Sequence, residues 1–411
     1  MKRLFLLIPG LIMLLAIGEA QNISGKNLKK HIKFLASDSL HGRNAGSADE
    51  LKAAEYIAGV FKKYKLQFLP GSNSYLHNFS FKAKENPHGT DTSAGVIKNC
   101  RNVIGYLNNN AAQTIVLGAH YDHLGFGMDH NSLDPNPKGK IHNGADDNAS
   151  GTAGILELAR VLSNKKSKLN FNIIFCLFSG EEFGLVGSKK LIEQQKFDST
   201  NIKYMFNFDM IGRMNDSSKA LLVMGYGTSP EWGKIVPGSN REFHLRYDSA
   251  GIGPSDYTSF YLQNIPVLGF FTGQHSDYHK PTDDVEKINF KDEVKILEFV
   301  LRIIHETTHY SKISFRTTFS KESKNTDFKV TLGIMPDYIY EGKGLRIDGV
   351  TEGKPAFKAG LLRGDVIIKF EEMVINDIQD YMKALTKTKK GETKRITVLR
   401  GSEVITVVVI F

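Results

Sequence analysis

Four strongly apolar runs in this chain each stop beside a residue that can bind a metal. The runs cover residues 115–119, 171–178, 204–208 and 266–271, and helical stretches separate them. Short continuous runs of this kind are typical of parallel strands that are buried on both faces of a sheet. We therefore expect an α/β fold of three layers, in which helices cover both faces of a mostly parallel central sheet.

The polar residues that follow these runs are candidates for chemistry at one edge of that sheet. With a further aspartate from the loop at 143–151, the candidates are His120, Asp122, Asp147, Glu181, Glu182, Asp209 and His279. Ligands collect outside the carboxyl ends of parallel strands. Histidine nitrogens and carboxylate oxygens bind zinc, and catalytic zinc sites keep one position open for water. The pattern predicts a metal-dependent hydrolase.

Spacing suggests different roles for neighbouring candidates. His120 and Asp122 are two residues apart at a strand end, so both side chains can point to the same side. We expect His120 to bind metal while Asp122 accepts a hydrogen bond from its other ring nitrogen. Glu181 and Glu182 are adjacent, so their side chains diverge, and one can bind metal while the other acts as general base. Spacing alone does not say which glutamate has which role.

The segments around these runs predict helices. Residues 24–66 have a helical period, interrupted by a glycine-rich loop at 40–47. A second helix is expected at 153–162, where Ser150 or Thr152 can cap the polar start. Both helices would pack against the predicted sheet.

The C-terminal part of the chain reads as a separate unit. Residues 311–326 are polar and poor in core residues, which indicates a linker, and we place it at 312–328. The unit after it, 329–411, has short strands, glycine-bearing turns and two short helices at 355–361 and 378–385. We expect a small α+β domain there.

The N-terminus has the composition of a secretory signal. Lys2 and Arg3 precede an apolar stretch at 4–17, and small residues follow before position 21. The stretch is short for a bilayer span, so cleavage after residue 20 is preferred over an uncleaved anchor. We expect an exported protein, periplasmic or secreted, with no membrane span after cleavage.

Net charge and cysteine count exclude few classes of protein. The net charge is +9, from 53 basic and 44 acidic residues, and removal of residues 1–20 leaves +8. The lysines are scattered rather than gathered with aromatics, so nucleic-acid binding is not expected. Cys176 lies inside an apolar run, so no disulfide with Cys100 is expected.

Several motifs together resemble one enzyme family. They lie at residues 42–46, 118–123, 144–151, 179–188, 207–212, 255–256 and 278–283. In these segments the chain is similar to the co-catalytic zinc aminopeptidases, which include bacterial secreted leucyl aminopeptidases and whose catalytic domain resembles those of aminopeptidase Y and glutamate carboxypeptidase. The resemblance implies an aminopeptidase-like domain at 24–311 with two zinc ions per chain and peptide substrates that have a free N-terminus.

The resemblance also implies roles for single residues. His120 and Asp209 would bind one zinc, Glu182 and His279 the other, and Asp147, preferred over Asp146, would bridge them. Glu181 would be the general acid/base, taking a proton from the bridging water and returning it to the leaving amine while the metals stabilise the oxyanion. The further implications are oxyanion support from Tyr278, a cis peptide at Asp147–Asn148, and a departure at Tyr257, where many relatives have histidine.

The C-terminal unit resembles a PDZ domain of the bacterial protease type. The similarity rests on residues 331–334, 344–350 and 359–367. It implies that backbone N–H groups around Leu332, Gly333 and Ile334 capture the C-terminus of a peptide or protein, while the bound chain adds a strand to the sheet edge. A module that only packs against the catalytic domain is the alternative.

Three other functions stay open from sequence. A glutaminyl cyclase has the same fold but uses a single zinc, and a carboxypeptidase is compatible with the same ligands. A peptide-binding scaffold with a decayed peptidase would have lost some of the ligands, yet all five and Glu181 are present. The preferred N-terminal residue of the substrate is not readable.

Overall fold

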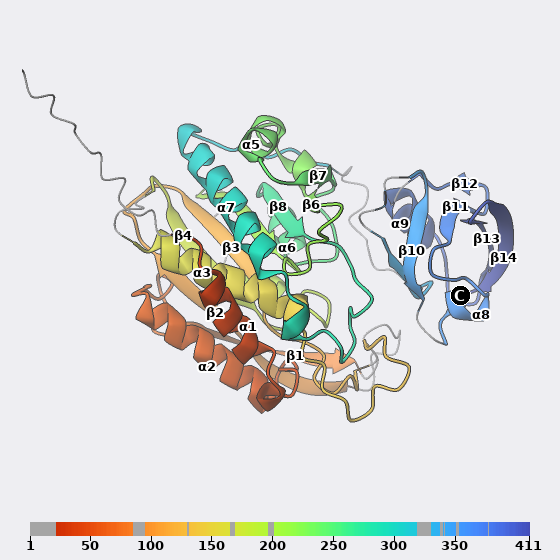
Figure 1. The fold of residues 1–411 in the computed structure, drawn as a ribbon, viewed down its shortest axis with the longest axis horizontal. Helices are drawn as coiled ribbons and strands as arrows, with labels where there is room; N and C mark the ends of the chain where they lie inside the picture. The colour runs from red at the N-terminus through yellow and green to blue at the C-terminus, as the bar shows by residue number, and fades with distance from the viewer. Residues whose placement is uncertain are drawn as a thin grey trace, which may run out of the picture.

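The computed structural model describes residues 22–84, 95–129, 131–164, 169–195, 201–318, 330–337, 340, 342–350, 353–376 and 378–411. These residues form two sheets, each with its own hydrophobic core (Figure 1). The predicted secretory signal at 1–20 lies outside the described residues.

The first sheet and its helices take up the chain as far as residue 306. In chain order they are α1 (Gly25–Leu35), α2 (Ala48–Lys63), β1 (Leu76–Lys84), β2 (Gly95–Leu107), β3 (Thr114–His120), α3 (Gly151–Leu162), β4 (Asn172–Phe178), α4 (Val186–Gln195), β5 (Ile202–Phe208), β6 (Ala220–Met224), α5 (Trp232–Ser239), β7 (His244–Tyr247), α6 (Tyr257–Tyr261), β8 (Val267–Phe271) and α7 (Phe290–Glu306).

The four apolar runs form adjacent parallel strands, as the sequence predicted. The order of the eight strands is β1-β2-β4-β3-β5-β8-β6-β7, and β4, β3, β5 and β8 pair in parallel. Strands β3, β4 and β5 are buried along almost their whole length because helices cover both faces of the sheet. The carboxyl ends of these strands therefore open at one edge.

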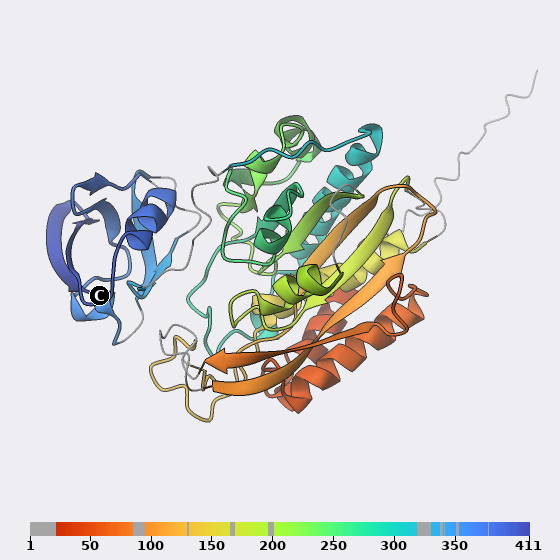
Figure 2. The same ribbon diagram turned by 180° about the vertical axis from the view of Figure 1, so that it is seen from behind.

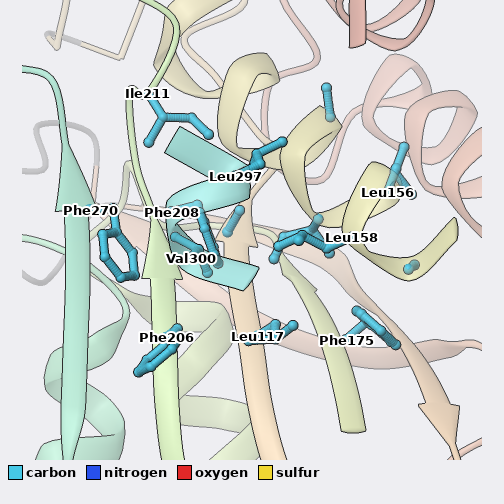
Figure 3. Packing of buried hydrophobic residues seen from close by; sticks show 14 of the residues in the cluster. Leu117, Leu156, Leu158, Phe175, Phe206, Phe208, Ile211, Phe270, Leu297 and Val300 are labelled. Atoms are coloured by element: carbon cyan, nitrogen blue, oxygen red, sulfur yellow. The ribbon is translucent and has the colours of Figure 1, made fainter. Parts of the chain in front are cut away.

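Alternate strand residues pack into two separate layers. Leu117 and Phe175 point to the face covered by α1, α2, α3 and α7, where they meet Leu156 and Leu297 (Figures 1 and 3). Residues one position along the same strands, such as Val116, pack on the opposite face with α4 and α6, the side seen in Figure 2. This confirms the three-layer arrangement.

One local prediction was wrong. Neither Ser150 nor Thr152 caps α3: the Ser150 hydroxyl donates to Asp146 and the Thr152 hydroxyl to the carbonyl of His120. Instead the Asn148 side-chain oxygen accepts the Gly151 N–H at 2.9 Å. The serine and threonine hydroxyls are used to fix the segments that carry the candidate ligands.

The second sheet belongs to the C-terminal part of the chain. Its elements are β9 (Ile334–Pro336), β10 (Leu345–Val350), α8 (Pro355–Lys358), β11 (Val366–Phe370), β12 (Met373–Val374), α9 (Ile378–Thr386), β13 (Thr393–Arg400) and β14 (Glu403–Ile410). The strand order is β14-β13-β11-β10-β9, and every recorded pairing is antiparallel. Strand β9 is thus an edge strand, and Leu332, just before it, is fully buried in the local core.

Two further observations concern the described residues. None of their helices is both long enough and apolar enough to cross a bilayer. Cys100 and Cys176 are buried with free thiols.

Candidate metal centre

The candidate ligands come from four strand ends and one loop. His120 is the last residue of β3, and Asp209 follows β5 directly. Glu182 lies in the turn after β4, His279 in the loop after β8, and Asp147 just before α3. Parallel pairing of these strands brings residues far apart in the sequence to the same edge of the sheet.

One group of ligand atoms gathers around the first oxygen of Asp147. The His120 Nε2 atom lies 3.3 Å from Asp147 Oδ1 and 3.5 Å from Asp209 Oδ1. His120 is buried, and Asp209 borders the adjacent cavity. These three side chains could hold one metal ion.

A second group gathers around the other oxygen of Asp147. The His279 Nε2 atom is 3.2 Å from Asp147 Oδ2 and 3.2 Å from Glu182 Oε2. His123, which was not among the predicted ligands, places its Nδ1 atom 2.9 Å from Glu182 Oε1 and 3.8 Å from Asp147 Oδ2. Asp147 therefore stands between two ligand groups, one on each of its oxygens.

The spacing of these atoms suits zinc better than direct hydrogen bonds. Tetrahedral bonds of about 2.05 Å place neighbouring ligand atoms about 3.3 Å apart, and the four spacings that join His120 or His279 to a carboxylate are 3.2–3.5 Å. Charge-assisted N–H···O bonds are usually about 2.7–2.9 Å long. Asp147 Oδ2 is also buried without a hydrogen-bond partner. The donor set fits zinc.

Main-chain carbonyls orient His120 and His279, the two histidines whose Nε2 atoms face the carboxylates. The His120 Nδ1 atom is 3.2 Å from the carbonyl oxygen of Asp122, and the His279 Nδ1 atom is 2.8 Å from that of Asn131. An Nδ1–H that donates to a carbonyl leaves Nε2 free for a metal. The Asp122 carboxylate was expected to accept the His120 bond; it is instead 3.8 Å away and accepts the Glu181 N–H at 3.2 Å.

The loop that carries Asp147 is held from two sides. The buried Arg43 guanidinium donates to the carbonyls of Leu35, Tyr121, Asn143, Gly144 and Asp147. The Asp283 carboxylate accepts the N–H groups of Asp146 and Asp147, each at 3.0 Å. The Asp147–Asn148 peptide is cis, which confirms the prediction made from the family resemblance.

Asp146 faces away from both ligand groups. Its Oδ1 atom accepts from Gly212 N and Ser150 Oγ, and its Oδ2 atom lies 3.2 Å from His275 Nε2. With these partners, the side chain anchors the loop. The geometry favours Asp147 over Asp146 as the shared carboxylate.

The pKa values of the two adjacent glutamates are shifted in opposite directions. Burial raises the pKa of Glu181 well above its usual range, and the nearby Glu182 carboxylate adds to the rise. Burial would also raise the pKa of Glu182, but the charge of His279 and the hydrogen bond from His123 bring it down to about 2. Pairs of carboxyl groups whose pKa values are pushed apart in this way suit one proton carrier and one ligand.

A cavity opens beside the two ligand groups. Its apolar wall consists of Met210, Met224, Pro254 and Phe271. Glu181 and Tyr278 also line it, and the Tyr278 ring stacks on His279 with 3.9 Å between ring centres. The cavity thus brings an apolar wall next to the ligand side chains, Glu181 and Tyr278.

Three residues of the centre were not assigned a role from sequence. His123 stands three positions after His120, a spacing that could have drawn attention to it. Arg43 was noted only as part of a matching motif, and nothing in the sequence pointed to the Asn131 carbonyl. Their roles depend on chain segments that are distant in sequence.

Sequence comparisons agree with this geometry. Residues 102–304 match the model of peptidase family M28, and residues 318–410 match that of the PDZ domain. Leucine aminopeptidase 2 of Trichophyton rubrum is 28% identical over 237 residues, which cover 49% of this chain and 46% of that protein. The chain thus spans less than half the length of this curated relative.

Solved structures share the fold of the first sheet and its helices. A zinc aminopeptidase from Bacillus subtilis matches with a TM-score of 0.55 at 17% identity, covering 72% of this chain and 98% of that one. A glutaminyl cyclase from Bacteroides thetaiotaomicron also gives 0.55, at 18% identity, covering 69% and 98%. At such identities the likeness concerns the fold alone, while the family models assign the domains: this chain carries a peptidase family M28 domain followed by a PDZ domain.

Proposed function

We propose that this protein is a zinc-dependent aminopeptidase that uses two metal ions. The observation that carries the proposal is the position of Asp147, whose two oxygens face separate ligand groups, with Glu181 on the wall of the adjoining cavity. His120 and Asp209 complete one site, and Glu182 and His279 the other. The 3.2–3.5 Å spacings within these groups support zinc in both.

Glu181 is proposed as the general acid/base. Bound zinc would polarise the scissile carbonyl and lower the pKa of the attacking water. Glu181 would take the proton of that water and pass it to the leaving amine, a role that suits a carboxyl group whose pKa is raised by burial. Its main-chain N–H is fixed by Asp122, so the side chain keeps its place beside the cavity.

Tyr278 is proposed to support the developing oxyanion. It lines the same cavity and its ring is stacked on His279. A phenol O–H held at this place could donate to the carbonyl oxygen as negative charge develops there.

The substrate is proposed to be a peptide with a free N-terminus. The curated relative is a leucine aminopeptidase, and the wall formed by Met210, Met224, Pro254 and Phe271 suits an apolar first side chain. A carboxypeptidase is less favoured, because the described residues that line the cavity include no arginine or lysine to pair with a terminal carboxylate. A glutaminyl cyclase shares the fold but, with its single zinc, would leave one of the two ligand groups without a role.

The remaining parts of the chain complete the proposal. We propose that residues 1–20 direct export, that the catalytic domain extends over 24–311, and that a linker at 312–328 precedes the PDZ domain at 329–411. The PDZ domain would bind the C-termini of peptides or proteins by strand addition at the edge strand β9, beside Leu332, Gly333 and Ile334.

The test is hydrolysis of three peptide sets by wild type, Glu181→Gln and the surface control Glu242→Gln. The sets are unblocked, N-blocked and C-blocked. We expect cleavage only where the N-terminus is free, and a fall in kcat of about 10²–10⁴-fold for Glu181→Gln at unchanged zinc content. Cleavage of N-blocked peptides would refute the aminopeptidase assignment, and release of ammonia from N-terminal glutamine without peptide cleavage would favour the cyclase.

A further inference from the structure

His123 lies beside the second ligand group, with its ring directed at Glu182. Its Nδ1 atom is 2.9 Å from Glu182 Oε1, a hydrogen-bond distance, but 3.8 Å from Asp147 Oδ2. The His279 Nε2 atom, by contrast, is 3.2 Å from both carboxylates. His123, Asp147 and Glu182 also form a group that could hold a metal ion, so His123 is either a ligand of the second site or a partner of its ligand Glu182; the 2.9 Å distance to Glu182 favours the partner.

The two carboxylate oxygens of Glu182 contact different histidines, His123 and His279. Oε2 faces His279 Nε2, and Oε1 faces His123 Nδ1. If Oε1 is engaged by a ring N–H, only Oε2 remains for the metal. Glu182 would then bind through one oxygen, and the second site would keep a position open for water or substrate.

The surroundings of the ring fix this contact. The His123 side chain is fully buried, and its Nε2 atom has no hydrogen-bond partner within the part of the chain that the structure describes. A neutral imidazole carries one N–H, and the carboxylate beside Nδ1 is the acceptor that places it there. The main chains of Asn44 and His123 form an isolated β-bridge. Gly144 lies so close to the His123 ring that a Cβ atom on residue 144 would come within 2.5 Å of it. The ring therefore has little room to turn.

We propose that His123 is a positioning residue for the second zinc: it donates its Nδ1–H to Glu182 Oε1 and so restricts Glu182 to binding through Oε2. The inference rests on the proposed two-zinc function. Partners that orient a metal ligand typically change metal affinity by about 10–100-fold. Loss of His123 should weaken the second site alone, because the ligand oxygens that His123 faces, Glu182 Oε1 and Asp147 Oδ2, belong to the second group.

The experiment is titration of the metal-free full-length protein with Zn²⁺ in competition with a chelator. The variants are His123→Ala, His123→Asn and the control His31→Ala. The control removes another buried histidine, one that is hydrogen-bonded to Tyr56 on helix α2. In asparagine the amide nitrogen is attached to Cγ, as Nδ1 is in histidine, so His123→Asn keeps a donor near the same place.

We expect two zinc sites in the wild type, His123→Asn and the control. In His123→Ala one site should be weaker by about 10–100-fold, with the other unchanged. If His123→Asn is as weak as His123→Ala, Nδ1 is itself a zinc ligand and the positioning role is refuted. Equal affinity of all variants would refute it too, whereas a wild type that binds fewer than two zinc ions would instead refute the proposed function. Should His123→Ala fail to fold, the asparagine variant still decides between donor and ligand.

Discussion

Replacing Arg43 should destabilise the M28 domain strongly, although the residue touches no substrate. Its guanidinium makes five hydrogen bonds, all to main-chain carbonyls, and it is completely buried. Two of the acceptors, Asn143 and Gly144, belong to the loop that leads to Asp147. Arg43 thus joins the end of α1, the end of β3 and the ligand loop.

The magnitude follows from the acceptors that Arg43→Ala would leave behind. Gly144 O also accepts the Ala149 N–H, so it keeps a partner. Of the four other carbonyls, we take two to be reached by water and two to stay buried without a partner. At about 2 kcal/mol for each unpaired carbonyl, the free energy of unfolding falls by about 4 kcal/mol. That is a large part of the roughly 5–15 kcal/mol that stabilises a domain. Arg43→Lys keeps the charge but not the fork of donors, so about half of this loss is expected.

The measurement is urea unfolding of the metal-free protein, followed by the fluorescence of Trp232. This is the only tryptophan of the chain and is buried in the core of the first sheet, so it reports on the M28 domain. Arg302→Ala is the control, since Arg302 donates to Ser239 O and to Glu242 from a partly exposed position. A loss below about 1 kcal/mol in Arg43→Ala, or one no greater than in the control, would refute the reasoning.

Two further predictions concern pH and catalysis. Burial, with Lys30 and Lys63, lowers the pKa of His31 to about 4, so the unfolded chain binds a proton below about pH 6.5 that the folded chain takes up only near pH 4. The free energy that neutral His31 contributes to folding is fully present above pH 6.5 and falls by up to about 3 kcal/mol toward pH 4. In urea unfolding at pH 7 and 4.5, His31→Gln should therefore lose less stability between the two pH values than the wild type. An equal loss in the two proteins would contradict this prediction. Tyr278→Phe should lower kcat by about 10–10²-fold with little change in KM in steady-state assays, and an unchanged kcat would exclude the phenol from oxyanion support.

The sequence predicted the sheet and the edge at which the site lies because both follow from local composition. Strands β3, β4 and β5 are buried on two faces, so their apolar runs are continuous and easy to recognise. The expected cap on α3 failed because the hydroxyls of Ser150 and Thr152 are taken up by contacts with Asp146 and His120. The contact of Thr152 with His120 joins residues that are distant in sequence, so the local pattern could not reveal it.

His123 shows the same limit at the site itself. Its place next to Asp122 in the sequence was visible, but its role depends on where the ring points. Asn44 pairs with the main chain of His123, and Gly144 lies against its ring. Both residues are distant from His123 in sequence. The Asp122 carboxylate could be assigned to His120 from spacing, yet in the folded chain it accepts the Glu181 N–H. Spacing identified the residues of the site more reliably than their partners.

The fold by itself does not decide between the functions considered. A zinc aminopeptidase and a glutaminyl cyclase match this chain with the same TM-score of 0.55, so the distinction has to come from side chains. The residues that matter are His120 and Asp209, because an enzyme with one zinc has no use for this additional ligand group beside Asp147 Oδ1. In this chain the His120 Nε2 atom lies 3.3 Å from Asp147 Oδ1 and 3.5 Å from Asp209 Oδ1. The group on the other side of Asp147 is present too, since His279 Nε2 lies 3.2 Å from Asp147 Oδ2 and from Glu182 Oε2. The presence of both ligand groups is the reason why two metals are proposed, and zinc titration of the wild type and the His123 variants tests that number directly.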